Sequence, residues 1–365
     1  MSTSSSDTVR ALNAVVDSAV TLVQQLRGAL AQIQKDTARE SDKQTETPEQ
    51  DGLQLAKDSA SLIKAHATKL SLLVITEPLT PSAITTVIRE LVSGPITGLA
   101  TSVQLCAPGL YTKALQQELL WRSQSVYTGL LDLLQKIPRD GKVLSGAAKQ
   151  GSAVDGKGSL ASTGILWSAC DKVIELANGG LRGFYVHKIA EWKETLEDIA
   201  EELKEWGDEE GDESGDEDDD ALGSGDEQAQ DIANAFMSSH GTIPADDPDE
   251  IRPRLESALK RLRLAVILCM AVDKRRMKKL PTGTPGQDVI ARLGTAVDKL
   301  HQLPDDFGDL AAGLYELDPE EIDEAIERCC SNAVAVGETL NHDWNGGTDE
   351  FTEWMTKFRS EIRKS

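Results

Sequence analysis

The helical spacing of apolar residues is the feature that most constrains the fold of this 365-residue chain. From residue 9 to residue 33, and in most segments up to residue 362, apolar side chains recur mainly at steps of three and four. This spacing places them on one face of an α-helix, whereas a half-buried strand requires alternation at every second residue. No sustained alternation occurs, so the chain is expected to be all-α. Because aromatic residues make up only 4% of the chain, its core must be built mainly from Leu, Ile, Val and Ala.

Breaks in this spacing divide the chain into separate expected helices. In the first half they are residues 9–33, 55–73, 81–103 with a kink at Pro95, 115–137, and 160–206 with Gly179-Gly180 as a point of bending. In the second half they are a short helix around 232–236, then 248–279, 285–303, 305–315, a helix from 319, and a last helix over 351–362. Asp318-Pro319-Glu320-Glu321 has the order of cap, proline and acids that a helix start favours.

Residues 207–227 interrupt the helical pattern with twelve carboxylates and no cation, and they supply about half of the net charge of −23. Such a segment cannot bury apolar surface and its like charges repel, so it is typical of a disordered connector. A chain of this length also exceeds one ordinary core. We therefore expect two helical bundles, residues 1–206 and 228–365, joined by an acidic disordered linker at 207–227.

The acidic segment resembles a calcium loop at first sight. Carboxylates occupy four ligating positions of an EF-hand loop that would begin at Asp216. However, Ala221 stands where the sharp turn requires Gly, and Gly223 stands where an apolar residue normally anchors the loop. Specific calcium binding is therefore not expected.

Two serines in the same segment match the pattern of acidophilic kinases of the casein-kinase type. Ser214 and Ser224 are each followed by Glu three residues later, with further acids around them. Phosphorylation would add about 1.5 to 2 negative charges at each site. Both serines are predicted phosphosites.

The motifs of catalysis and cofactor binding are incomplete. The loop at 151–159 nearly spells a phosphate-binding P-loop, but Gly158 stands where Ser or Thr must reach magnesium, and no strand pattern precedes the loop. The five histidines show no metal-ligand spacing, and neither H-E-x-x-H nor G-x-S-x-G occurs. We therefore expect no enzyme activity, no cofactor and no metal.

The composition also indicates the compartment and the kind of partner. Five cysteines, an odd number without C-x-x-C and each among apolar neighbours, are typical of a reducing compartment. The first ten residues lack the apolar core of a secretory signal, and the longest apolar run, Leu264–Val272, is far shorter than the roughly 20 residues that span a bilayer. A strongly acidic chain with few aromatics disfavours direct nucleic-acid binding. Protein partners in the cytoplasm and nucleus, without membrane insertion, are expected.

The densest basic cluster, within DKRRMKKL at 273–280, is open to several interpretations. Its members could form a nuclear-import signal or a contact for an acidic partner, which includes the acidic connector of the same chain. Cations at the C-terminal end of a helix also stabilise the helix dipole, and this simpler interpretation is favoured. The cluster comprises Lys274, Arg275, Arg276, Lys278 and Lys279.

The helix before that cluster carries an apolar seam from Ile251 to Val272 at steps of 4, 4, 3, 4, 3 and 3. A seam of this kind can zip with a partner helix or form the core face of an antiparallel bundle. The flanking helices favour the bundle.

Four segments resemble the cyclin-D-interacting protein family, also called GCIP or cyclin-D-binding protein. They are EPLTPSAITTVIREL, LLDLLQKIPRD with the loop after it, LWSACDKVIEL, and LKRLRLAVILCMAV after the acidic segment. The resemblance implies two helical bundles like those of talin and vinculin. It also implies a non-enzymatic regulator that binds D-type cyclins and helix-loop-helix transcription factors and restrains the cell cycle. The family is described as having leucine-zipper character, but the seam from Ile251 lacks a strict leucine heptad. The alternative is a cytoskeletal or trafficking adaptor with vinculin-like bundles.

Overall fold

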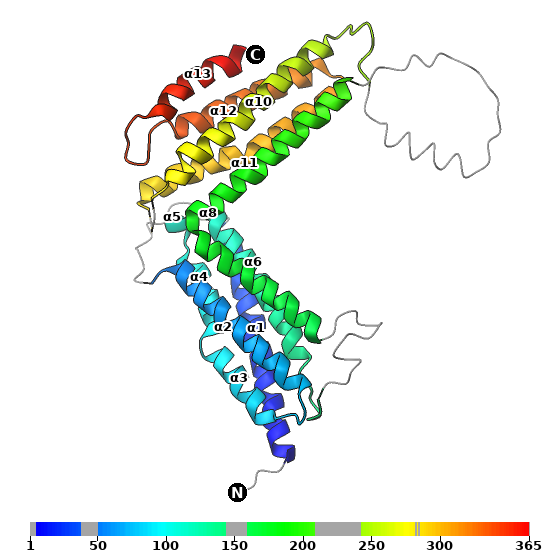
Figure 1. Cartoon of the computed structure of the whole chain (residues 1–365), viewed down its shortest axis with the longest axis vertical. Helices are drawn as coiled ribbons and strands as arrows, with labels where there is room; N and C mark the ends of the chain where they lie inside the picture. Colours follow the sequence, from blue (N-terminus) through cyan, green and yellow to red (C-terminus); the bar gives the residue numbers. More distant parts are fainter. Residues whose placement is uncertain are drawn as a thin grey trace, which may run out of the picture. The chain divides into compact units, whose positions relative to one another are not determined.

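A computed structural model of the chain describes residues 5–37, 50–143, 159–208, 242–281, 283 and 285–364. Within these ranges the regular structure is helical, without strands, which confirms the all-α prediction (Figure 1). No helix in the described ranges is both long enough and apolar enough to span a bilayer. The predicted linker from residue 209 onward, both predicted phosphosites and the short helix expected near 232 lie outside the described residues.

The chain divides into two compact units, one of residues 1–184 and 282–291, the other of residues 185–281 and 292–365. Both this boundary and the predicted one at residue 206 lie in the long helix α8 (Ser159–Asp208), but the two units divide earlier, between Phe184 and Tyr185. Gly180 lies four residues before this boundary; its backbone (φ 59°, ψ −163°) is non-helical and interrupts α8 at a conformation that glycine adopts easily. The bend expected at Gly179-Gly180 is confirmed, but residues 185–206 belong to the second unit.

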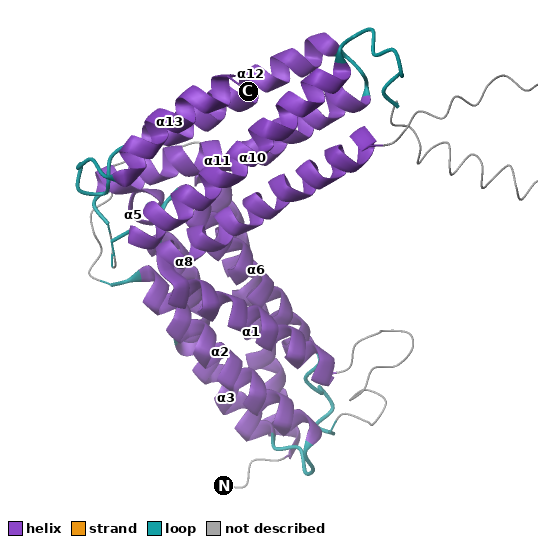
Figure 2. Cartoon of the chain, turned by 45° about the horizontal axis from the view of Figure 1, so that its top comes forward, coloured by secondary structure: helices purple, strands orange, loops and turns teal. Residues whose placement is uncertain are grey.

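The first unit is a bundle of helices (Figure 2). α1 packs against α3 and α6, and α2 packs against α3 and α4. Its helices are α1 (Ser5–Thr37), α2 (Gly52–Ile75), α3 (Pro81–Ser93), α4 (Pro95–Leu105), α5 (Pro108–Tyr111), α6 (Lys113–Gln135) and the first part of α8.

The proline pattern of the first unit differs from the prediction in one place. Pro95 was expected to kink a single helix over 81–103, but α3 ends at Ser93 and Pro95 begins the separate helix α4. The physical reason is that a proline lacks the N–H of a helix interior and is well suited to a first turn. Gly94 lies between the two helices with a non-helical backbone.

The second unit holds the second part of α8 together with the helices from residue 251 onward, except the first turn of α11, whose residues up to Ala291 belong to the first unit. α10 packs against α12 and α13, and its apolar seam is buried in this bundle, which confirms the core interpretation of that face. Pro304 lies inside α11, so the two helices expected on either side of it form one helix. The helices are α10 (Ile251–Arg275), the 3-10 turn η1 (Met277–Lys279), α11 (Gln287–Tyr315), α12 (Pro319–Thr339) and α13 (Glu350–Lys364).

Acidic side chains cap the starts of α10, α12 and α13, the last through Asp349. The Asp318 carboxylate accepts hydrogen bonds from the backbone N–H of Glu320 at 3.0 Å and of Glu321 at 3.1 Å, so the predicted start of α12 is confirmed. The Asp247 carboxylate likewise accepts from the backbone N–H of Ile251 at 2.7 Å. Both contacts satisfy N–H groups that have no partner within the helix.

Candidate interaction site

α6 and the first part of α8 run antiparallel and approach closely in the first unit. A Cβ added at Gly129 of α6 would lie only 3.2 Å from the Cα of Leu166 in α8, so the absence of a side chain permits this approach. Arg122 Nη1 donates a hydrogen bond to the carbonyl of Lys172, and Lys136 near the other end of α6 contacts Ser162. These contacts position the facing surfaces of the two helices.

A groove of about 230 Å³ opens between α6 and α8. Trp121 lies at one side of it and is 56% exposed, an unusual position for the largest apolar side chain. Ile165 lines the groove from α8 and is also exposed. We call this the Trp121 groove; its lining residues are Trp121, Arg122, Ser125, Ile165, Ser168, Ala169 and Lys172.

Two cations line the Trp121 groove, but Arg122 is already paired with Glu118, so Lys172 is the lining cation left for a partner. Arg122 Nε donates to Glu118 Oε1 at 2.7 Å, which holds the guanidinium in place, and Lys172 is exposed. Among the lining residues none is acidic. The groove therefore suits an apolar side chain that has a carboxylate close to it in sequence.

The position of α8 beside the groove is further secured by a contact with α2. Lys64 Nζ lies 2.5 Å from Asp171 Oδ1 and 2.7 Å from Asp171 Oδ2. Because both side chains are partly exposed, this ion pair orients α8 more than it stabilises the fold. The groove is thus formed by packed helices, which hold a binding surface more firmly than loops do.

The cysteines of the described residues are packed in the helical cores. The described ranges contain no group of three or more His, Cys, Asp or Glu side chains that could hold a metal ion. All five cysteines are buried and free, and burial raises the pKa of Cys106 and of Cys170 to about 12. Such thiols carry no appreciable thiolate at neutral pH and are unsuited to nucleophilic attack.

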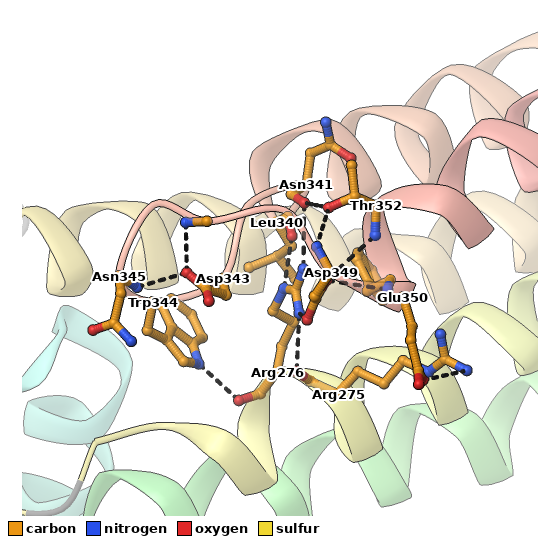
Figure 3. A network of polar contacts seen from close by, with 12 residues as sticks. Arg275, Arg276, Leu340, Asn341, Asp343, Trp344, Asn345, Asp349, Glu350 and Thr352 are labelled. Atoms are coloured by element: carbon orange, nitrogen blue, oxygen red, sulfur yellow. Dashed lines mark hydrogen bonds and ion pairs between the residues drawn. The ribbon is translucent and has the colours of Figure 1, made fainter.

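The predicted basic cluster is not one surface patch, because Arg276 is fully buried. Its guanidinium donates to Asp349 Oδ2 at 2.8 Å and to Asp349 Oδ1 at 2.9 Å, and its Nε donates to the carbonyl of Leu340 at 2.7 Å (Figure 3). It also lies 4.3 Å from the ring centre of Phe351, and its carbonyl accepts from Trp344 Nε1 at 2.8 Å. Arg276 therefore cannot serve as an import or partner contact.

The other members of the basic cluster lie at the surface to different degrees. Lys274, Lys278 and Lys279 are exposed, and Arg275 is half-buried. Arg275 pairs with Glu350 at 3.7 Å, and Lys278 pairs with Asp273 at 2.6 Å. Their role as an import signal or a partner contact remains a prediction.

The helical spacing did not single out the Trp121 groove. The apolar face expected for this helix contains Leu119 and Val126, and Trp121 lies away from it. A large aromatic residue off the apolar face of a helix is the signal that could have found it. Ile165 could not be recognised in this way, because only the packing of α8 against α6 brings it beside Trp121.

The described residues thus form helical bundles with an exposed apolar groove on α6 and α8. Residues 55–209 match the model of the family described as Grap2 and cyclin-D-interacting, N-terminal. The resemblance inferred from the sequence is thereby confirmed over this segment, which contains every lining residue of the Trp121 groove.

A fungal protein shows similarity over most of the chain. The uncharacterized protein C22E12.18 of Schizosaccharomyces pombe (strain 972 / ATCC 24843) is 25% identical over 310 residues, which cover 84% of this chain and 82% of that protein. No solved structure matches the chain.

Proposed function

We propose that this chain is a non-enzymatic protein-interaction regulator of the cyclin-D-interacting kind. Its partner places an apolar side chain in the Trp121 groove. The observation that carries this proposal is the exposed Trp121 in a groove within the segment that matches the family. Trp and Arg side chains at the centre of an interface supply most of the binding free energy at many protein–protein contacts.

The Trp121 groove offers a partner an apolar contact and a charged contact. Burial of Trp121 and Ile165 by a partner removes apolar area from water, which favours association. The exposed Lys172 at the edge attracts a partner with carboxylates and raises the rate of encounter. We expect a D-type cyclin, or a helix-loop-helix regulator, to supply an apolar side chain followed or preceded by an acidic one.

Substitution of Trp121 tests the proposed function directly. Trp121→Ala is expected to weaken binding to a purified D-type cyclin by about tenfold or more, because it removes a central apolar anchor. The dissociation constant is measured by isothermal titration calorimetry with the full chain. Leu72→Ala is the matched control, since Leu72 is equally exposed at 57% and lies on α2 outside the groove.

The result that contradicts the proposal is equal cyclin affinity in the wild type and in Trp121→Ala. If purified cyclin does not bind at all, while actin-linked or vesicle proteins are recovered from native extract, the alternative of a cytoskeletal or trafficking adaptor is favoured instead. Circular dichroism of Trp121→Ala shows whether the helices are intact.

The cell-cycle role and the compartment belong to the same proposal. A regulator that binds D-type cyclins is expected to slow cell-cycle progression in the cytoplasm and nucleus, and Trp121→Ala is expected to abolish this effect. Flow cytometry of cells that express each form measures it. Phosphorylation of Ser214 and Ser224 remains a prediction; intact mass without phosphate on protein from the native host would exclude it.

A further inference from the structure

The outward face of α10 in the second unit carries cations and apolar residues in one continuous row. Along the helix the row follows steps of 3, 4, 3 and 4, so its members lie on one face. The buried face of α10, which includes Leu262, Ala265 and Cys269, lies on the other side of the helix. We call this row the α10 stripe; its members, all exposed, are Lys260, Arg263, Ile267, Met270 and Lys274.

The apolar members of the α10 stripe lie at its centre. Ile267 and Met270 are both among the large apolar side chains that the described residues leave exposed. Met is flexible and polarizable, so it adapts to the surface of a partner. Lys260 and Arg263 precede them along the helix and Lys274 follows, which gives an apolar centre with a charged border, as in many protein interfaces.

The cations of the α10 stripe have no ion-pair partner within the described parts of the chain, although the protein has 61 acidic residues against 38 basic ones. Some other cations of the same unit are paired. Arg254 of α10 pairs with Asp323 at 2.9 Å, and Arg328 of α12 pairs with Asp309 at 2.9 Å. Glu256 is exposed on the same face one turn before Lys260, so the three cations leave this face of α10 with a net positive charge of two on an acidic protein.

The dimensions and charge of the α10 stripe indicate one kind of partner. Fourteen residue steps from Lys260 to Lys274 correspond to about 21 Å along a helix, or about four turns. A partner helix of similar length can lie along this face with apolar residues against Ile267 and Met270. Carboxylates on either side of its apolar row would meet the three cations.

We propose that the α10 stripe is a docking surface for an acidic amphipathic helix of another protein. Charge complementarity selects an acidic partner over a basic or neutral one, and the two apolar side chains select a helix with an apolar row. The stripe lies outside residues 55–209, so the surface is separate from the Trp121 groove and from the segment that matches the family.

Binding of a synthetic helical peptide to the full chain tests this proposal. The probe is a fluorescein-labelled peptide of about 18 residues with Leu along one edge and Glu elsewhere, and fluorescence anisotropy gives its dissociation constant. Reversal of all three charges (Lys260→Glu, Arg263→Glu and Lys274→Glu) is expected to weaken binding about tenfold or more. Ile267→Ser with Met270→Ser is expected to weaken it several-fold at unchanged charge.

A matched charge-reversal variant controls for general attraction between a peptide and any cation. Arg27, Lys69 and Lys113 are exposed, belong to the first unit, and have no ion-pair partner among the described residues. Reversal of these three to Glu changes the net charge by the same amount and is expected to leave the affinity of the α10 stripe nearly unchanged.

Four outcomes would overturn the proposal. The first is that the peptide does not bind, and the second is that the control variant loses as much peptide affinity as the stripe variant. The third is that Ile267→Ser with Met270→Ser leaves the peptide affinity unchanged. The fourth is that the peptide binds to the stripe only after residues 209–227 are replaced by a neutral Gly-Ser segment. In the last case the acidic segment of this chain, and not another protein, would be the occupant of the stripe.

Discussion

Arg276 shows how much a single buried charge determines in the second unit. Its side chain is fully buried and contacts Asp349 through two hydrogen bonds, so it connects the end of α10 to the start of α13. The same carboxylate accepts from the backbone N–H of Phe351 at 3.1 Å and thereby caps α13. Removal of one member of such a pair leaves the other charge buried without a counter-charge.

Asp349→Ala is therefore expected to lower the free energy of unfolding of the second unit by about 3 kcal/mol. Glu350→Ala is the neighbouring control and is expected to cost less than about 0.5 kcal/mol, because Glu350 is largely exposed and lies 3.7 Å from Arg275. Urea unfolding, monitored by hydrogen exchange in peptides from α13, measures the loss of unfolding free energy in both variants. A smaller loss for Asp349→Ala than for Glu350→Ala would contradict this account of Arg276.

The Asp349 carboxylate also makes the free energy of unfolding depend on pH in the acidic range. Hydrogen bonds from the Arg276 side chain are the main cause that lowers the pKa of Asp349 from 3.8 to about 2. Because the pKa of Asp349 is lower in the folded than in the unfolded protein, its ionisation stabilises the folded state, and it does so fully at pH values above the unfolded-state pKa. This contribution is lost as pH falls from about 4 towards 2. It amounts to about 2 kcal/mol at neutral pH.

The difference in unfolding free energy between the wild type and Asp349→Asn is accordingly expected to shrink by about 1.5 kcal/mol between pH 6 and pH 2.5. Comparison with a variant that cannot titrate at this position cancels the effect of the other carboxylates. Urea unfolding at both pH values gives the difference, and a constant difference would show that Asp349 titrates normally.

At the scale of helices, the contact between α6 and α8 controls the Trp121 groove. Gly129 allows the two backbones to approach near Leu166. A Cβ at 3.2 Å from a backbone atom cannot be relieved by rotation of a side chain, so the helices themselves must move. Gly164 lies on the exposed face of α8, and a Cβ there would meet no atom within 4 Å.

These two glycines are expected to respond to alanine in opposite directions. Gly129→Ala should destabilise the first unit by about 1 to 2 kcal/mol through overpacking. Gly164→Ala should stabilise it by about 0.5 to 1 kcal/mol, because alanine favours a helix interior. Chemical denaturation of both variants, followed by the fluorescence of Trp121 and Trp167, measures the changes. An equal effect of the two substitutions would show that the helix contact is not the cause.

At the scale of the whole molecule, α8 passes from one compact unit into the other. Its second part is packed within the second unit, where Trp206 lies 5.2 Å from the ring of Tyr315 and Trp192 lies 5.6 Å from the ring of His301. The acidic segment at 207–227 lies between α8 and α10 in the sequence, and both α10 and the second part of α8 belong to the second unit.

Cleavage in the acidic segment is consequently expected to leave the protein assembled. Limited digestion with a glutamate-specific protease should cut first within residues 209–227, where acids are dense and apolar residues few. The two fragments should elute together in size-exclusion chromatography without denaturant and separate only in urea. Elution of the N-terminal fragment by itself in native buffer would favour two independent bundles divided at residue 206.

The sequence by itself determined the helical class, most helix positions, the cap at Asp318 and the bend at Gly180, together with the family resemblance over residues 55–209. Helix positions and the Asp318 cap depend on interactions between residues two to four positions apart, and the bend depends on the backbone freedom of glycine, so all three are local properties of the sequence. Only the tertiary structure decided that Arg276 is buried, that Ile165 lies beside Trp121 and that α8 belongs to both units. Arg276 and Asp349 are 73 residues apart, so their pairing arises from the packing of helices and leaves no periodic signal in the chain.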